Sequence, residues 1–103
     1  MIQLEKKFNE KRFNQTAQLL KAMGHPIRIA ILNLLLDGTR KTVTEIHTSL
    51  GLEQAVVSQH LSILRTRGVV DSTRKGKNSY YFIQNTSYAK VVELAMRNVQ
   101  IFP

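Results

Sequence analysis

The sequence has no cysteine and no tryptophan, and only seven of its 103 residues are Asp or Glu. The missing cysteines exclude disulfides, thiolate zinc sites, iron–sulfur clusters and thiol nucleophiles, and they favour a reducing compartment. No run approaches the roughly 18 apolar residues of a membrane span, and the first seven residues lack the apolar core of a secretory signal. We therefore expect a soluble, cytoplasmic chain that does not insert into a membrane.

Positive charge is what the sequence has in excess. Fifteen Lys and Arg stand against the seven acids and give a formal net charge of +8. This surplus favours a polyanionic partner, a nucleic acid or a membrane surface, because each cation placed on a phosphate releases condensed counterions. A chain of 103 residues is too short for two separate cores, so we expect residues 1–103 to form a single domain.

Hydrophobic spacing predicts a mainly α-helical fold with about five helices and one small β-hairpin. The apolar stripes are broken at Gly24-His25-Pro26, and the T-x-x-E spacing from Thr42 predicts a capped helix start. Glycine at positions 51 and 68 marks two further ends. The predicted helices cover residues 2–23, Pro26 to about Leu36, Thr42 to near Gly51, Gln54 to Arg67, and 86–100, and the predicted strands cover Val69–Lys75 and Ser79–Ile83 around a Gly76-Lys77-Asn78 turn.

Three stretches match one known pattern in order and spacing. They read HPIRIAIL from His25, VSQHLSILR from Val57 followed by GVV from Gly68, and RKGK from Arg74 leading to two tyrosines. Together they span over half of the chain and resemble the ArsR/SmtB family of bacterial transcriptional repressors. The resemblance implies a winged helix-turn-helix, and a homodimer that binds operator DNA and represses until an inducer arrives.

The predicted helix from Gln54 to Arg67 has a small, polar outer face opposite its apolar stripe. Such a helix can enter the major groove, because nothing bulky holds it off the base edges. Gln59 is the best candidate for a bidentate contact to adenine, and Val56 could touch a thymine methyl. An ordinary solvated helix face is the alternative. The residues that we predict to face DNA from this helix are Gln54, Ala55, Val56, Ser58, Gln59 and Ser62.

Arg74, Lys75 and Lys77 crowd the predicted hairpin tip, where like charges repel unless an anion lies across them. A wing laid along phosphates or into a minor groove would supply that anion, and a solubilising loop is the alternative. Arg65 suits the negative end of its helix dipole and is a further candidate for DNA binding. Thr44, near the start of the third predicted helix, could also bond a phosphate.

The histidines do not predict a metal site. His25, His47 and His60 fall in three predicted elements without an i, i+4 pair, and we interpret His60 as a hydrogen-bonded residue at the core boundary. Metal-sensing members of the family that the chain resembles carry Cys-Val-Cys where this sequence has Thr42-Val43-Thr44, and hydroxyls are poor ligands for soft metals. We therefore expect no metal and no cofactor, and the sequence does not identify a small-molecule inducer.

The first and last predicted helices each carry an apolar stripe that a monomer would leave partly exposed. Pairing across a two-fold axis would bury both stripes and set two recognition helices roughly 34 Å apart, one turn of duplex. The alternative is that both helices fold back onto the monomer core.

Three classes of function remain, with unequal support. The leading hypothesis is a homodimeric, sequence-specific transcriptional regulator that binds double-stranded DNA. The second is a winged-helix module for protein–protein interaction, in which the positive charge is incidental. Catalysis has little support, because the sequence offers no nucleophile with a nearby base, no phosphate-binding glycine loop and no clustered carboxylates.

Overall fold

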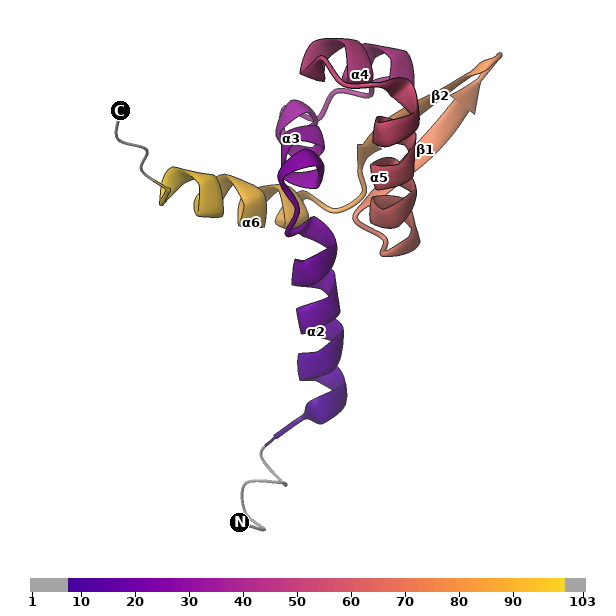
Figure 1. Cartoon of the computed structure of the whole chain (residues 1–103). Helices are drawn as coiled ribbons and strands as arrows, with labels where there is room; N and C mark the ends of the chain where they lie inside the picture. The colour runs from indigo at the N-terminus through magenta and orange to yellow at the C-terminus, as the bar shows by residue number, and fades with distance from the viewer. Residues whose placement is uncertain (1–7, 100–103) are drawn as a thin grey trace.

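The computed structural model of the chain describes residues 8–99. Within that range five helices follow one another, with a β-hairpin inserted before the last (Figure 1). The predicted fold class, mainly helical with one small hairpin, is confirmed. The elements are α2 (Glu10–Met23), α3 (Pro26–Leu34), α4 (Val43–Leu50), α5 (Gln54–Thr66), β1 (Val70–Lys75), β2 (Asn78–Ile83) and α6 (Thr86–Arg97).

Residues 8 and 9, which we predicted to be helical, lie outside helix α2, which begins at Glu10. The side chain of Asn9 accepts a hydrogen bond from the backbone N–H of Arg12 at 3.0 Å and thereby caps α2, which starts at Glu10. A local cap of this kind ends the helical pattern even though Phe8 continues the apolar composition. Residues 2–7 of the predicted helix lie outside the described residues.

Two other helix ends also differ from the prediction. α3 stops at Leu34, and Leu35 and Leu36 form a turn in which the N–H of Leu35 donates to the carbonyl of Leu32 at 3.0 Å. α6 stops at Arg97 rather than near residue 100, because the side chain of Asn98 donates to the carbonyl of Leu94 at 2.7 Å and occupies one of the last helical acceptors. Residue 100 itself lies outside the described range.

One hydrophobic core holds the elements together. Ile31 and Leu32 on α3 are completely buried against α5 and α4, and Val92 of α6 and Met23 of α2 close the cluster at its edges. Each buried Leu or Ile contributes about 1.5–3 kcal/mol. None of the described polar residues is buried, so the interior is apolar throughout. The side chains with less than 2 % exposure are Ile31, Leu32, Leu35, Ile46, Val57, Leu61, Leu64, Val69 and Val70.

A short turn joins α4 to α5 and forms the helix-turn-helix. α4 starts with the predicted capping box, in which the Thr42 hydroxyl accepts from the Glu45 N–H at 3.1 Å and the Glu45 carboxylate accepts from the Thr42 N–H at 3.0 Å. It ends at Gly51, whose φ of 67° lies in the left-handed region that strains residues with a side chain. The capping box therefore sets where α4 begins, and Gly51 sets where it ends before the chain turns into α5.

The hairpin is tighter than predicted. Its register pairs Val70 with Ile83 and Lys75 with Asn78. Asn78, which we placed in the turn, is therefore the first residue of β2, and the turn consists of Gly76-Lys77 alone. A two-residue turn requires a left-handed backbone, which Gly76 supplies with φ 61°.

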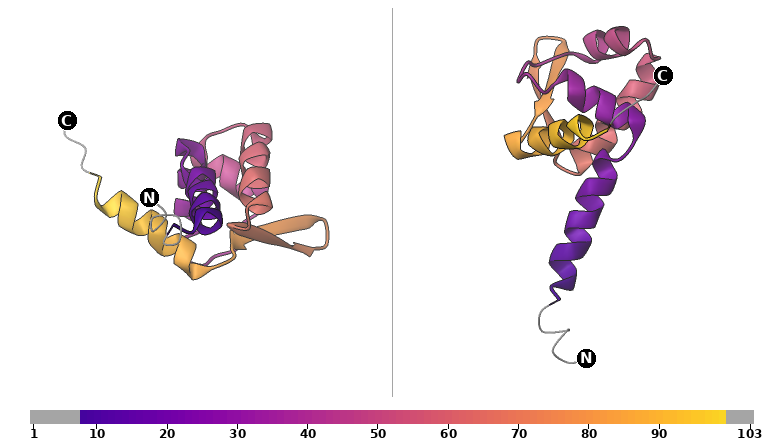
Figure 2. Two further views of the ribbon diagram at one scale, coloured as in Figure 1. Left: turned by 90° about the horizontal axis from the view of Figure 1, so that it is seen from below. Right: turned by 90° about the vertical axis from the view of Figure 1, so that its left-hand side faces the viewer.

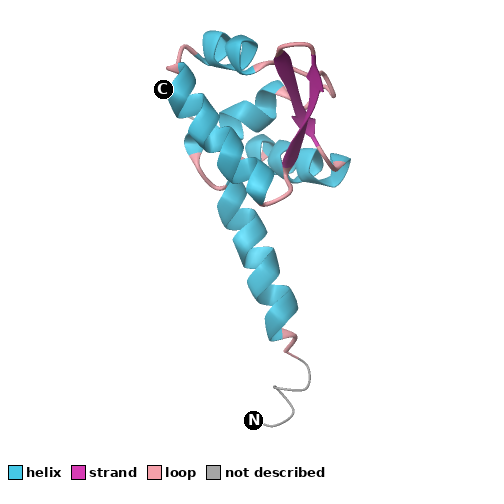
Figure 3. Ribbon diagram, turned by 90° about the vertical axis from the view of Figure 1, so that its right-hand side faces the viewer, coloured by secondary structure: helices cyan, strands magenta, loops and turns pink. Residues whose placement is uncertain are grey.

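The hairpin is fastened to the loop that precedes α4. Lys41 and Tyr81 exchange two backbone hydrogen bonds, of 3.0 and 2.7 Å, as an isolated antiparallel bridge. Figure 3 shows the two strands standing against the helical body, while α2 extends away from it. Figures 1 and 2 show the hairpin and α6 on opposite sides of the body.

Candidate nucleic-acid interface

The outward face of α5 is free of overlying chain. Val57, Leu61 and Leu64 anchor the helix with exposures of 0 %, 1 % and 0 %, so the opposite face must point to solvent. Val56, on the flank, is half-buried. The predicted DNA-facing residues Gln54, Ala55, Ser58, Gln59 and Ser62 are all exposed.

The N-terminal end of α5 adds hydrogen-bond donors to this face. Glu53 is the N-cap, and its side chain makes no capping hydrogen bond, so the first backbone N–H groups of the helix remain available. Free donors at a helix start can bind a phosphate group. Thr44, the other phosphate candidate, is exposed in the first turn of α4.

The wing carries its charge at the tip. Arg74, Lys75 and Lys77 are all exposed, and the only described contact of their charged groups is from Arg74 Nε to the carbonyl of Gly76 at 3.3 Å. The hairpin tip and the N-terminal end of α5 point the same way, away from α2 (Figures 1 and 2). The structure therefore brings the predicted wing cations and the predicted base readers to one end of the molecule.

Arg40, in the loop before α4, is a basic residue beside the wing that our sequence reasoning missed. Its guanidinium lies 3.9 Å from the centre of the Phe82 ring and donates to the Thr73 hydroxyl at 2.9 Å. Together with Thr73, Lys75 and Tyr80 it lines a hollow of about 390 Å³. Stacking and hydrogen bonding orient this cation before any ligand arrives. Its positive charge next to the Thr42 capping box was visible in the sequence, but its position over the wing depends on long-range contacts.

Arg65 differs from the other predicted basic residues. It lies 11 residues beyond Gln54, about 17 Å along the helix axis, and its Nε is 3.6 Å from the Asp71 carboxylate. Both side chains are about half exposed, so this ion pair is weak and can exchange with another anion. Arg65 therefore lies near the end of α5 that is opposite its base-reading end.

Two histidines that the sequence left apart are neighbours in the structure. The His25 and His60 rings lie 4.5 Å apart, and His60 Nδ1 is 3.3 Å from Arg28 Nη1. Burial lowers the pKa of His60, and the nearby charges of His25 and Arg28 lower it further. Our interpretation of His60 as a hydrogen-bonded boundary residue agrees with this geometry. His25 caps α3, with its Nδ1 accepting from the Ile27 N–H at 3.1 Å.

The described part of the chain contains neither a cluster of metal-ligating side chains nor a membrane-spanning helix. Between residues 8 and 99, no three His, Cys, Asp or Glu side chains are grouped so that they could hold a metal ion. None of the helices in that range has the length and apolar character that a bilayer crossing requires.

A helix-turn-helix followed by a basic hairpin defines a winged helix-turn-helix protein. Comparison with solved structures supports this class. HlyU from Vibrio cholerae superposes with a TM-score of 0.78 at 35 % identity, over 85 % of this chain and 95 % of that one. A homodimeric winged helix-turn-helix DNA-binding domain from Mycobacterium bovis gives a TM-score of 0.77 at 29 % identity, over 87 % and 84 % of the two chains.

Sequence comparison identifies the family. The model of bacterial regulatory proteins of the arsR family matches residues 25–72. The biofilm growth-associated repressor of Xylella fastidiosa is 35 % identical over 83 residues, which cover 81 % of this chain and 72 % of the relative. The chain belongs to the arsR family. It is a DNA-binding transcriptional regulator, and the comparisons do not favour the alternative of a protein-interaction module.

Proposed function

We propose that the chain is a homodimeric, sequence-specific repressor that reads operator DNA with α5 and holds the phosphate backbone with its wing. The observation that carries the proposal is the exposed face of α5, built from short polar side chains and oriented like the cationic tip of the wing. Short side chains allow the helix axis to approach the base edges, and the wing cations lower the free energy of the complex through counterion release.

Gln59 is the residue to which we assign most of the sequence preference. Its amide can accept and donate at once, as N7 and N6 of adenine require. Ser58 and Gln54 extend the contact along the same face of α5. Thr44, Arg65, Arg74, Lys75 and Lys77 are proposed to bind phosphates, which set the position of the protein on the duplex without reading sequence.

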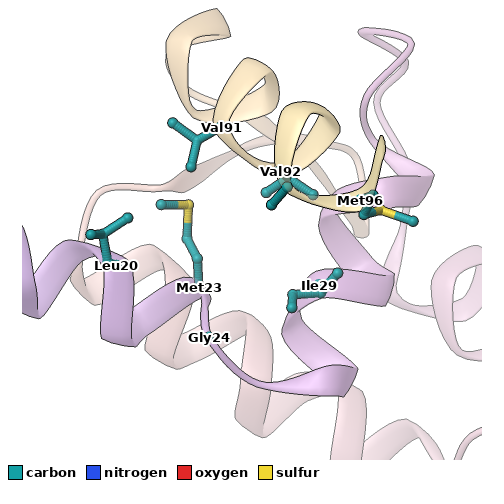
Figure 4. A pocket seen from close by; sticks show the side chains of 8 residues that line it. Leu20, Met23, Gly24, Ile29, Val91, Val92 and Met96 are labelled. Carbon is teal, nitrogen blue, oxygen red and sulfur yellow. The ribbon is translucent and has the colours of Figure 1, made fainter. Parts of the chain in front are cut away.

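The homodimer is supported by where apolar surface remains exposed. Among the described residues, eight large hydrophobic side chains are exposed, and all except Ile63 belong to α2, α6 or the residues next to them. α2, α3 and α6 also enclose an apolar hollow of about 160 Å³ (Figure 4). A second copy would cover this surface and set two α5 helices one duplex turn apart. The exposed residues of the two terminal elements are Phe8, Phe13, Leu20, Val91, Leu94, Met96 and Val99.

We assign repression because a relative of this chain, the biofilm growth-associated repressor, is named a repressor. HlyU, 35 % identical over 88 residues, is named a transcriptional activator. Transcription in a purified system with and without the protein therefore tests directly whether this chain represses or activates. The proposal includes no catalytic step, and it places the protein in the cytoplasm with the chromosome.

The test begins with selection of bound fragments from random duplexes, which yields the operator and its half-site spacing. Fluorescence anisotropy then measures the affinity of the wild type and of Gln59→Ala for the selected duplex and for a scrambled one. A bidentate contact contributes about 1–3 kcal/mol to discrimination between bases. In Gln59→Ala the ratio of affinities for the selected and the scrambled duplex should therefore fall by roughly 5- to 150-fold.

Gln15→Ala provides the matched control, because Gln15 is an exposed glutamine on α2, far from the face of α5. It should leave both affinities unchanged. An equal loss of affinity for both duplexes in Gln59→Ala would refute the base-reading role. Failure to select any sequence would refute specific binding altogether.

A further inference from the structure

A third hollow lies between α2, α3 and α5, with a volume of about 300 Å³. Gln18, Lys21 and Ala22 contribute from α2, Arg28 from α3, Ile63 from α5, and Arg67 from the C-cap position directly after α5. Its lining therefore contains three cations, from α2, from α3 and from the C-cap of α5, and no acidic side chain. Three cations that converge in this way repel one another unless an anion lies between them.

The rest of the described chain does not neutralise these charges. The two ion pairs found between residues 8 and 99 are Arg65 with Asp71 and Arg97 with Glu93, so neither involves the hollow. Arg28 carries the clearest sign of a missing partner, because its buried Nε–H donates to no hydrogen-bond acceptor among the described residues. Its Nη1 faces only the ring nitrogen of His60, at 3.3 Å.

Arg67 is already held in place for a ligand. Its Nη1 donates to the Gln18 side-chain oxygen at 3.0 Å, a contact that joins α2 to the end of α5. The remaining donors of a guanidinium form a planar fork that matches carboxylate and phosphate oxygens. Ala22 and Ile63 supply apolar surface beside it, which suits the carbon part of an organic anion.

The hollow is continuous with the recognition helix. A neighbouring hollow of about 220 Å³ shares Ile63 and Arg67 with it and extends to the hydroxyls of Ser62 and Thr66. Ser62 lies on the face of α5 that we assign to DNA. A molecule bound at Arg67 would therefore touch both α2, the proposed dimer helix, and the helix that reads the operator.

We propose that this hollow is an effector site for a small, multiply charged anion that carries phosphate or carboxylate groups. Lys21, Arg28 and Arg67 bind the anion, and its occupancy changes the affinity for DNA through the α2–α5 contact. The binding site is independent of the function proposed above, whereas its regulatory role rests on that function.

Calorimetry of the full chain with sodium pyrophosphate and with citrate, at ionic strength balanced by sodium chloride, tests the site. We expect saturable binding of one anion per chain. Binding of pyrophosphate alone identifies a phosphate ligand, and binding of citrate alone identifies a carboxylate ligand. Amide resonances of Gln18, Lys21 and Arg67 should shift together in nuclear magnetic resonance spectra of the labelled protein.

Arg67→Gln and Lys21→Gln should each weaken binding about tenfold, the effect of losing one charge-assisted contact. Both residues are exposed, so these variants keep the fold, and Lys11→Gln on the same helix α2 is the matched charge control. Absence of saturable heat through millimolar anion, an equal loss in Lys11→Gln, or shifts confined to the wing would overturn the site.

The regulatory role is tested on the selected operator duplex. Saturating anion should change duplex affinity by about fivefold or more in the wild type and leave it unchanged in Arg67→Gln. Anion binding without any change in duplex affinity would overturn the regulatory role and retain the site. If Arg67→Gln weakens duplex binding while neither anion binds, the cations contact DNA phosphates, and the effector proposal is wrong.

Discussion

Thr42 determines where α4 begins. Its hydroxyl accepts from the Glu45 N–H and also lies 3.1 Å from the Glu45 carboxylate, while the same carboxylate accepts from its backbone N–H. These bonds lower the pKa of Glu45. Thr42→Ala should reduce the free energy of unfolding by about 1–2 kcal/mol, measured by urea denaturation. Thr48→Ala, an exposed change inside the same helix, should cost almost nothing, and equal losses would contradict the capping role.

His60 makes stability depend on pH. Its pKa in the folded chain is lowered by burial and by His25 and Arg28. The unfolded chain therefore binds a proton at this histidine more tightly than the folded chain does. The free energy of unfolding should therefore decrease as the pH falls from 7 to 5.5, through the ordinary histidine value. His60→Gln removes this titration while keeping a possible acceptor for Arg28. Its stability should vary less over that range, and identical slopes for the two proteins would refute the assignment.

The capping box and the His60 contact also show which single-residue features a sequence can reveal. Thr42 and Glu45 are three positions apart, so their spacing alone predicted the bonds. His60 and Arg28 are 32 positions apart, and only the packing of α3 against α5 brings them together. The same reason hid the role of Arg40, whose partners lie on the wing.

The wing is the element whose charge should govern salt dependence. Each phosphate contact contributes about 0.9 to the slope of log affinity against log salt concentration. Replacing Arg74, Lys75 and Lys77 together with Gln should flatten that slope by up to roughly 2.7 per wing, measured by anisotropy on the selected duplex. A single Lys11→Gln change, on α2, should leave the slope unaltered. An unchanged slope in the triple variant would mean that the tip does not touch phosphates.

The helices were predictable from the sequence where apolar residues that become buried recur at helical spacing. Val57, Leu61 and Leu64 fixed both the existence of α5 and its outward face, because all three lie on one side of a helix. Helix ends were less predictable. Asn9 sets the start of α2 and Asn98 the end of α6 through side-chain hydrogen bonds, although the sequence around each continues the helical pattern. Asn78 was misplaced because asparagine suits both a turn and a strand end.

At the scale of the whole molecule, we propose that the terminal helices form the dimer interface. Leu94 is 55 % exposed on α6, so Leu94→Glu should leave the monomer folded. In the proposed dimer it would bury an unpaired charge, and the dimer dissociation constant should rise by about 100-fold or more, measured by analytical ultracentrifugation. Duplex affinity should fall with it.

Asn33→Glu adds the same charge at an exposed position of α3 and should leave the mass of the assembly unchanged. A monomeric wild type would contradict the dimer. The apolar stripes predicted that these helices need covering, but a stripe in one chain does not specify what covers it, which is why their role as dimerisation elements stays a proposal.

The projecting part of α2 has a consequence for the amount of protein in the cell. Every residue from Glu10 to Gln18 is exposed, and a helix this short is marginal in water without support. If a second copy supplies that support, this part of α2 becomes helical only when two chains associate, so its helix content depends on protein concentration. The circular dichroism signal at 222 nm should then become more negative as the protein concentration rises. In a cell with few copies, this part of α2 would be unfolded, so gene dosage would set how much of the regulator can bind DNA.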